Sequence, residues 1–128
     1  ASYNRAKAYL AMSKDEAAVK DLKELAADTR TKEGAEAKYL LAQIEFDQEK
    51  YDDCENTIME YINESTPHAY WLARSFVLLS DLYSTQGKKM EAKQYLLSLQ
   101  NNYEGEDDIA EMIERRLEIL NKENEQHN

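Results

Sequence analysis

The apolar residues of this chain recur at the spacing of amphipathic helices and divide the sequence into seven segments. Within each segment they return every three or four residues, the period of one buried helix face. The expected helices cover residues 2–12, 13–29, 31–49, 52–63, 67–86, 88–102 and 108–120. Glycine occurs 3 times and proline once, which leaves little of the punctuation that strands and hairpins need. The pattern predicts an all-α protein.

Several predicted boundaries carry residues that start helices. Ser13 and Glu16 form the S-x-x-E pattern of a capping box before the second helix. Thr31 can cap the third helix. Thr66 followed by Pro67 predicts an N-cap with proline at the first helical position of the fifth helix. These residues fix the expected starts of three helices.

A longer period is superimposed on the helices. The clearest copy comprises Leu79, Ser80, Tyr83, Gly87, Ala92 and Leu96. The copy before it reads Leu41, Ala42, Glu45, Glu49, Cys54 and Ile58. The first copy reads Arg5, Ala6, Tyr9, Ser13, Ala18 and Leu22. Copies 36 and 38 residues apart, with small side chains where two helices must touch, predict pairs of helices stacked in an array.

Charge and cysteine content narrow the possible functions. Acidic residues outnumber basic ones by 26 to 16, and the net charge of −10 repels phosphate backbones, so nucleic acid is not an expected partner. The ordinary interpretation of this charge is solubility. Cys54 is the only cysteine, which excludes an internal disulfide and a cysteine-cluster metal site. No apolar run approaches the roughly 18 residues of a spanning helix, so we expect no membrane insertion by this segment.

No set of residues predicts catalysis, a cofactor or a metal site. His68 stands at the start of a helix and His127 in a polar tail, so neither belongs to a nucleophile–base pair. The acidic clusters around Asp52 and Asp108 lack the spacing of a calcium loop. We therefore expect a chain that is not an enzyme and that needs no cofactor.

The repeated residues resemble tetratricopeptide repeats, whose pattern is W-x2-L-G-x2-Y, then A-x3-F, then P. The third copy matches at Phe76, Leu79, Ser80, Tyr83, Ala92 and Leu96. The second copy departs at Lys38, where the aromatic residue is missing, and at Glu45, where tyrosine is usual. The resemblance implies a right-handed, antiparallel helix-hairpin solenoid of about three repeats with a closing helix.

Applied to the whole chain, the resemblance implies one domain. Its expected parts are repeats at about 1–30, 31–66 and 67–104, a closing helix at about 108–121 and a polar tail at 122–128. The first repeat lacks its opening and the chain starts without Met, so we expect a piece of a longer protein. The exposed side of that first repeat offers a surface for dimers of the fragment.

A closer likeness lies in residues 67–74, which read PHAYWLAR. This stretch resembles the last repeats of long tetratricopeptide proteins from Bacteroides-type bacteria, some of them cell-envelope proteins. The resemblance favours the cell envelope or periplasm as location, with the cytoplasm as the alternative.

The first helix of each repeat lines the concave side of the array in this family, so the resemblance also implies a binding surface. The matching positions are Glu36, Tyr39, Gln43, Phe46, Asp47, Arg74, Val77, Asp81, Ser84 and Thr85. Tyr39 and Phe46 are candidates to grip an extended peptide, or else to pack against adjacent helices. Arg74 is expected either to meet a ligand or to pair with Asp81 or Glu36.

The implied function is a non-catalytic protein–protein interaction module that binds a protein or peptide on this concave surface. Some family members capture the carboxylate of a chaperone tail, but Tyr3, Lys7 and Leu40 occupy the matching positions here, which disfavours that partner. Two alternatives stay open. One is a structural spacer or self-association segment of a long array, and the other is a regulatory domain attached to an enzyme or sensor.

Overall fold

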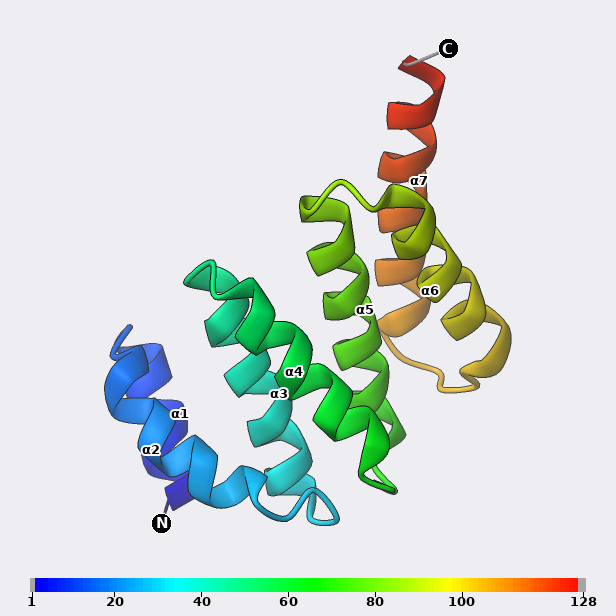
Figure 1. The fold of residues 1–128 in the computed structure, drawn as a ribbon. Helices are drawn as coiled ribbons and strands as arrows, with labels where there is room; N and C mark the ends of the chain where they lie inside the picture. Colours follow the sequence, from blue (N-terminus) through cyan, green and yellow to red (C-terminus); the bar gives the residue numbers. More distant parts are fainter. Residues whose placement is uncertain (1, 127–128) are drawn as a thin grey trace. The chain divides into compact units, whose positions relative to one another are not determined.

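The computed structural model of the chain describes residues 2–126, with side chains through residue 123. These residues form helices α1 (Ser2–Ala11), α2 (Asp15–Ala26), α3 (Lys32–Asp47), α4 (Tyr51–Asn63), α5 (Ala69–Thr85), α6 (Lys89–Asn102) and α7 (Ile109–Gln126) (Figure 1). No strand occurs in this part of the chain, which confirms the all-α prediction there. Helix α7 continues to Gln126, into the residues predicted as a polar tail from residue 122. His127 lies outside the described residues.

The chain divides into two compact units, Ala1–Leu72 and Ala73–Asn128. In the first unit, α1 packs on α2, α2 on α3 and α3 on α4, and the helices of each pair run antiparallel (Figure 1). In the second unit, α6 packs on α7. The hydroxyl of Ser80 on α5 donates a hydrogen bond to the carbonyl of Ala92 on α6 at 3.0 Å. Each unit is therefore built from helices packed on their neighbours in the chain, consistent with a helical repeat.

The small and apolar positions of the repeat lie in the core. Exposure is 2% or less at each of Ala6, Ala18, Leu22, Ala42, Cys54, Ile58, Ser80, Ala92 and Leu96. Small side chains at these positions allow the helix backbones to approach closely. Met90, near the start of α6, is 72% exposed. It stands two residues from buried Ala92, about 200° around the helix, and so faces the opposite side.

The same turn joins the two helices of each hairpin, α1–α2, α3–α4 and α5–α6. Its central residues have positive φ angles, 58° at Ser13, 60° at Glu49 and 80° at Gly87. The next residue is a lysine each time, and its backbone N–H donates 2.8 Å hydrogen bonds: Lys14 to Tyr9, Lys50 to Glu45 and Lys88 to Tyr83. A bond to the carbonyl five residues earlier, after a left-handed residue, defines a Schellman motif. The backbone thus repeats as the sequence does.

This turn overturns one prediction. Gly87 takes the left-handed conformation, which glycine adopts without strain. Ser13 takes the same conformation, so it ends the first hairpin's turn and does not cap α2. The residue before α2 is Lys14, and no side chain caps that helix end. The capping box of Ser13 and Glu16 is therefore not formed, because the turn needs Ser13 for its left-handed position.

Of the two predicted threonine caps, one is present. The side chain of Thr31 accepts a 2.9 Å hydrogen bond from the N–H of Gly34 and caps α3. Thr66 does not start α5, which begins at Ala69. Its hydroxyl instead donates to the carbonyl of Thr29 at 2.8 Å and accepts from the N–H of His68. Thr66 fails as a cap because it joins the α4–α5 loop to the α2–α3 loop.

Candidate functional site

The predicted binding residues on α3 are bound to one another and to α1. Glu36 is 5% exposed, and its carboxylate accepts hydrogen bonds from the Tyr3 hydroxyl at 2.8 Å and from Lys7 Nζ at 2.5 Å. These contacts raise the pKa of both Tyr3 and Lys7 above their usual values. Further along α3, Gln43 accepts a 3.0 Å bond from the Tyr39 hydroxyl and donates a 2.9 Å bond to Asp47. The Glu36 carboxylate therefore binds α3 to α1.

The two aromatic candidates of the first unit pack inside the chain. Tyr39 is 6% exposed, and its ring lies 5.7 Å from the ring of Trp71. Phe46 is half-buried, and its ring lies 5.7 Å from that of Tyr51 on α4. For both residues the contacts favour the packing interpretation over a grip on a ligand. Asp47 is the accessible member of this set, exposed at the end of α3.

The candidates of the second unit differ in accessibility. Val77 is buried in the core. Asp81 binds Arg116 of α7 through two hydrogen bonds, from Nε at 2.8 Å and from Nη2 at 3.1 Å. Arg74 and Ser84 are half-buried, and Thr85 is exposed at the end of α5. The sequence pattern did not single out Arg116, because nothing in its spacing links it to a residue 35 positions earlier.

The groove beside Lys38 in the first unit corresponds to an aromatic contact in the second unit. Lys38 Nζ forms ion pairs with Glu60 at 2.9 Å and Glu64 at 3.5 Å. The residue 38 positions after Lys38 is Phe76, whose ring stacks on Tyr95 with centroids 6.2 Å apart. The missing aromatic residue at Lys38 is thus replaced by an ion-pair cluster on the same face of the hairpin.

The second departure from the repeat pattern, Glu45, is compensated in the same way. Thr57 on α4 donates a 2.6 Å hydrogen bond to the Glu45 carboxylate. At the equivalent places of the third hairpin, Tyr83 and Tyr95 make a ring contact at 5.6 Å. Burial raises the pKa of Glu45, and the bond from Thr57 acts in the opposite direction.

Replacing Glu45 by glutamine is expected to raise the melting temperature at neutral pH. Glutamine keeps an oxygen that can accept from Thr57 and removes a carboxylate that burial disfavours. Because the folded-state pKa is raised, ionisation destabilises the fold above that pKa and has no such effect below the unfolded value. The gain should therefore disappear as the pH falls toward about 4. Thermal unfolding of both proteins across this range measures it.

Glu49→Gln is the matched control, since Glu49 is exposed in the adjacent turn and loses the same charge. We expect it to leave the melting temperature nearly unchanged. A Glu45→Gln variant that is less stable than the original at neutral pH would contradict the assignment of a desolvation cost to Glu45.

A buried carboxylate also joins the two helices of the first hairpin. Asp21 on α2 is 2% exposed and accepts 2.7 Å hydrogen bonds from Nε and Nη2 of Arg5 on α1. The paired guanidinium lowers the pKa of Asp21, so the carboxylate stays ionised at neutral pH. Arg5 replaces the leucine that this repeat position carries in the other hairpins. It serves to bind α1 to α2.

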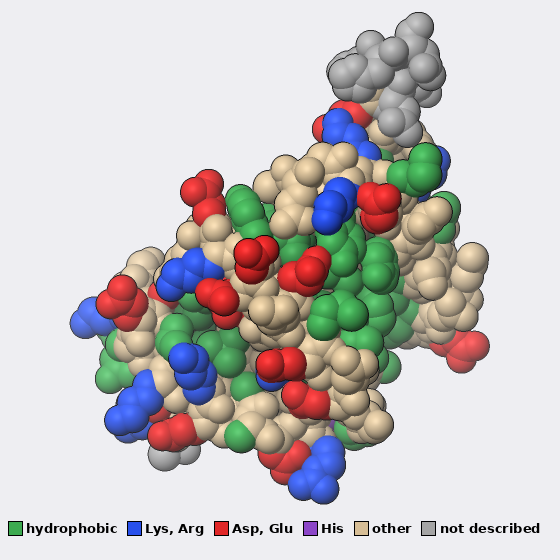
Figure 2. Space-filling model, in the orientation of Figure 1, with side chains coloured by type: hydrophobic (Ala, Val, Ile, Leu, Met, Phe, Trp, Pro, Cys, Tyr) green, Lys and Arg blue, Asp and Glu red, His purple; other side chains and the backbone are tan. Residues whose placement is uncertain are grey.

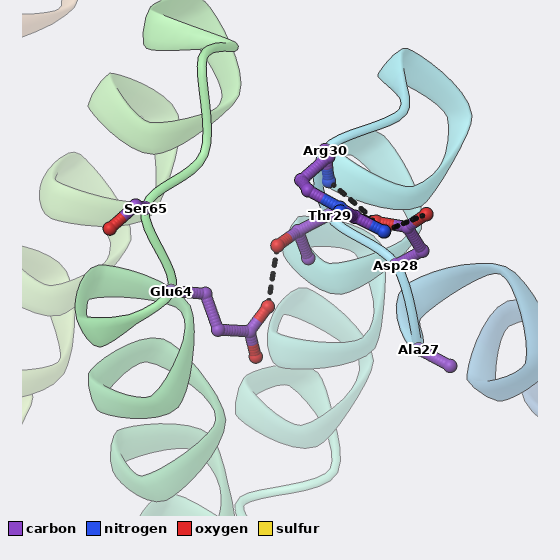
Figure 3. Close-up of a pocket in the computed structure, with 6 residues that line it drawn as sticks. All are labelled: Ala27, Asp28, Thr29, Arg30, Glu64 and Ser65. Atoms are coloured by element: carbon purple, nitrogen blue, oxygen red, sulfur yellow. Dashed lines mark hydrogen bonds and ion pairs between the residues drawn. The ribbon is translucent and has the colours of Figure 1, made fainter.

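A polar pocket of about 380 Å³ lies between the α2–α3 and α4–α5 loops of the first unit (Figure 3). Its charged groups bind partners within the chain. Asp28 pairs with Arg30 at 2.9 Å, and Glu64 accepts from the hydroxyl of Thr29 (Figure 3). His68 Nε2 lies 2.8 Å from the carbonyl of Arg30, to which it donates. The contacts of Thr29 with Glu64 and of Arg30 with His68 fasten the two loops together.

The cysteine and the potential metal ligands are the remaining reactive groups in the described part of the chain. Cys54 is fully buried, and burial raises the pKa of its thiol to about 12. The thiol is therefore protonated at neutral pH and is not a nucleophile. Among the residues with described side chains, no three of the types His, Cys, Asp and Glu gather as a metal site.

The surface carries charges of both signs. Figure 2 shows acidic and basic side chains interspersed over the face toward the viewer, without a basic stripe there. None of the helices in residues 2–126 combines the length and the apolar character needed to cross a bilayer.

No protein-family model, curated protein or solved structure matches this chain.

Proposed function

We propose that this chain is a non-catalytic interaction module of the tetratricopeptide type. In this proposal its hairpins form a right-handed solenoid within a longer protein, and a protein or peptide partner binds the concave side. The observation that carries the proposal is the repeated construction. The Schellman turns at Ser13, Glu49 and Gly87 and the buried small residues recur with the same period. Arrays of this kind provide extended binding surfaces.

The contacts within the predicted surface suggest which of its residues are held in place and which would bind such a partner. Glu36 and Tyr39 are held by intramolecular hydrogen bonds, so they would form a rigid floor. Asp47 and Thr85 are exposed at the ends of α3 and α5, so in this proposal they contact a ligand directly. A preordered surface loses less side-chain entropy when a peptide binds.

A selection of displayed random peptides on the whole chain tests this proposal. Peptides that bind the concave side should lose affinity for Asp47→Arg or Thr85→Arg. They should keep it for Asp52→Arg and Gln86→Arg, which alter exposed neighbours in matched ways. Selected binders that respond to none of the four substitutions would place the binding surface elsewhere and defeat the proposal.

A structural spacer within a long array is the second candidate. It is favoured by the internal use of Glu36, Tyr39 and Asp81, whose polar groups bind other residues of the chain. A spacer predicts that no peptide is selected and that tandem copies assemble without a ligand. Light scattering on this chain and on a longer one containing it separates the two candidates.

A further inference from the structure

The four methionines of the chain all lie in its described part, and none of them is buried. Met90 on α6 is 72% exposed, Met12 directly after α1 is 55% exposed, and Met59 on α4 is 38% exposed. Met112 on α7 is half-buried. Methionine is among the residues most often fully buried in proteins, so its place here is outside its usual one. Met12 and Met90 carry the most accessible thioethers of the chain.

The other hairpins have glutamine at the position of Met12. Met12 directly precedes the left-handed residue of the first Schellman turn, and Gln48 and Gln86 precede those of the second and third. Both glutamines are exposed. Methionine sulfoxide resembles glutamine, because each is an unbranched side chain with a polar oxygen near its end. Oxidation of Met12 would therefore give the first turn the polar character that the other two turns already have.

Met90 also stands where the other hairpins are polar. The equivalent residues are Asp52 in the second hairpin and Glu16 in the first, and both are exposed. A polar side chain at this position is therefore compatible with the packing of the hairpin. The one thiol of the chain, Cys54, is fully buried and does not compete for an oxidant in solution.

We propose that Met12 and Met90 are the sites at which a peroxide oxidises this chain to methionine sulfoxide, and that the helices keep their packing when both are oxidised. The sulfur lone pair attacks one peroxide oxygen, an S–O bond forms and the O–O bond breaks. Sulfur loses two electrons, and the other peroxide oxygen leaves as water with both peroxide protons. The core is preserved because no buried side chain becomes polar.

Treatment of the whole chain with increasing hydrogen peroxide, followed by mass spectrometry of its peptides, tests the proposal. Each sulfoxide adds about 16 Da. We expect this mass first on Met90 and Met12 and later on Met59 and Met112. While only the first two are oxidised, the helical circular dichroism and the melting temperature should stay unchanged.

Leu79→Met is the control for exposure, because it places a thioether in the core with little change of volume. This position should stay reduced while the chain is folded. Its early oxidation would overturn the proposal, since exposure would then not decide the order of reaction. Oxidation of Met59 or Met112 as early as that of Met90 would overturn it as well.

Met59→Leu with Met112→Leu confines oxidation to the two proposed sites. Leucine already occupies the position equivalent to Met59 in the third hairpin, as Leu97. A fall in the melting temperature when this variant is oxidised would contradict the claim that the packing tolerates both sulfoxides. The proposed concave surface is tested separately, because none of its residues is a methionine.

Discussion

Replacing Leu79 by alanine is expected to lower the free energy of unfolding by about 2–5 kcal/mol. Leu79 lies on α5 with none of its surface exposed, among other buried apolar residues such as Leu82 and Leu96. The truncation removes buried methyl groups and leaves a cavity that a close-packed core cannot fill completely. Urea denaturation followed by circular dichroism measures the change.

Leu97→Ala supplies the control for this loss. Leu97 lies on α6 and is 38% exposed, so the same truncation removes a side chain that is already partly in water. We expect it to cost clearly less than Leu79→Ala. Equal losses for the two variants would show that Leu79 does not occupy the core position assigned to it.

Replacing Gly34 by alanine should destabilise the first unit by an amount near the upper end of about 1–3 kcal/mol. A Cβ atom built on Gly34 would lie 1.8 Å from the carbonyl oxygen of Asp28 and 2.7 Å from that of Leu25. Both obstacles are backbone atoms of the preceding helix and turn, so no side-chain rotation relieves the clash. The first turn of α3 or the α2–α3 loop must move.

Glu33→Ala separates this clash from a general sensitivity of the helix start. Glu33 is exposed in the same turn of α3, and its truncation should change stability by less than about 0.5 kcal/mol. The comparison of melting temperatures is direct because the two substitutions are adjacent. A Gly34→Ala variant as stable as the original chain would contradict the close approach of α3 to the backbone of Leu25 and Asp28.

The helices and their core positions follow from local sequence patterns, whereas the starts of α2 and α5 do not. Spacing alone located Ala42 and Ser80 in the core, because a buried helix face repeats every three or four residues. It failed at Ser13 and Thr66, where a residue suited to capping is used by a turn or by another loop. One readable signal was missed: Lys14, Lys50 and Lys88 recur with the period of the repeat directly after each left-handed residue.

The candidate surface was less predictable than the fold because its residues are defined by partners from other helices. The resemblance located Glu36 and Asp81 on the exposed side of their helices, yet Lys7 and Arg116 bind them from 29 and 35 residues away. Which side chains meet at such a separation depends on how helices pack. Sequence periodicity describes one helix at a time, so it carries no such information.

These two ion pairs connect helices with opposite polarity. In the first unit the earlier helix supplies the cation, Lys7, and the later one the anion, Glu36. In the second unit the earlier helix supplies the anion, Asp81, and the later one the cation, Arg116. If the earlier helices of the two pairs exchanged places during misfolding or recombination, Lys7 would lie beside Arg116 and Asp81 beside Glu36. Like-charge repulsion would destabilise that arrangement, so these charges favour the correct order of the helices.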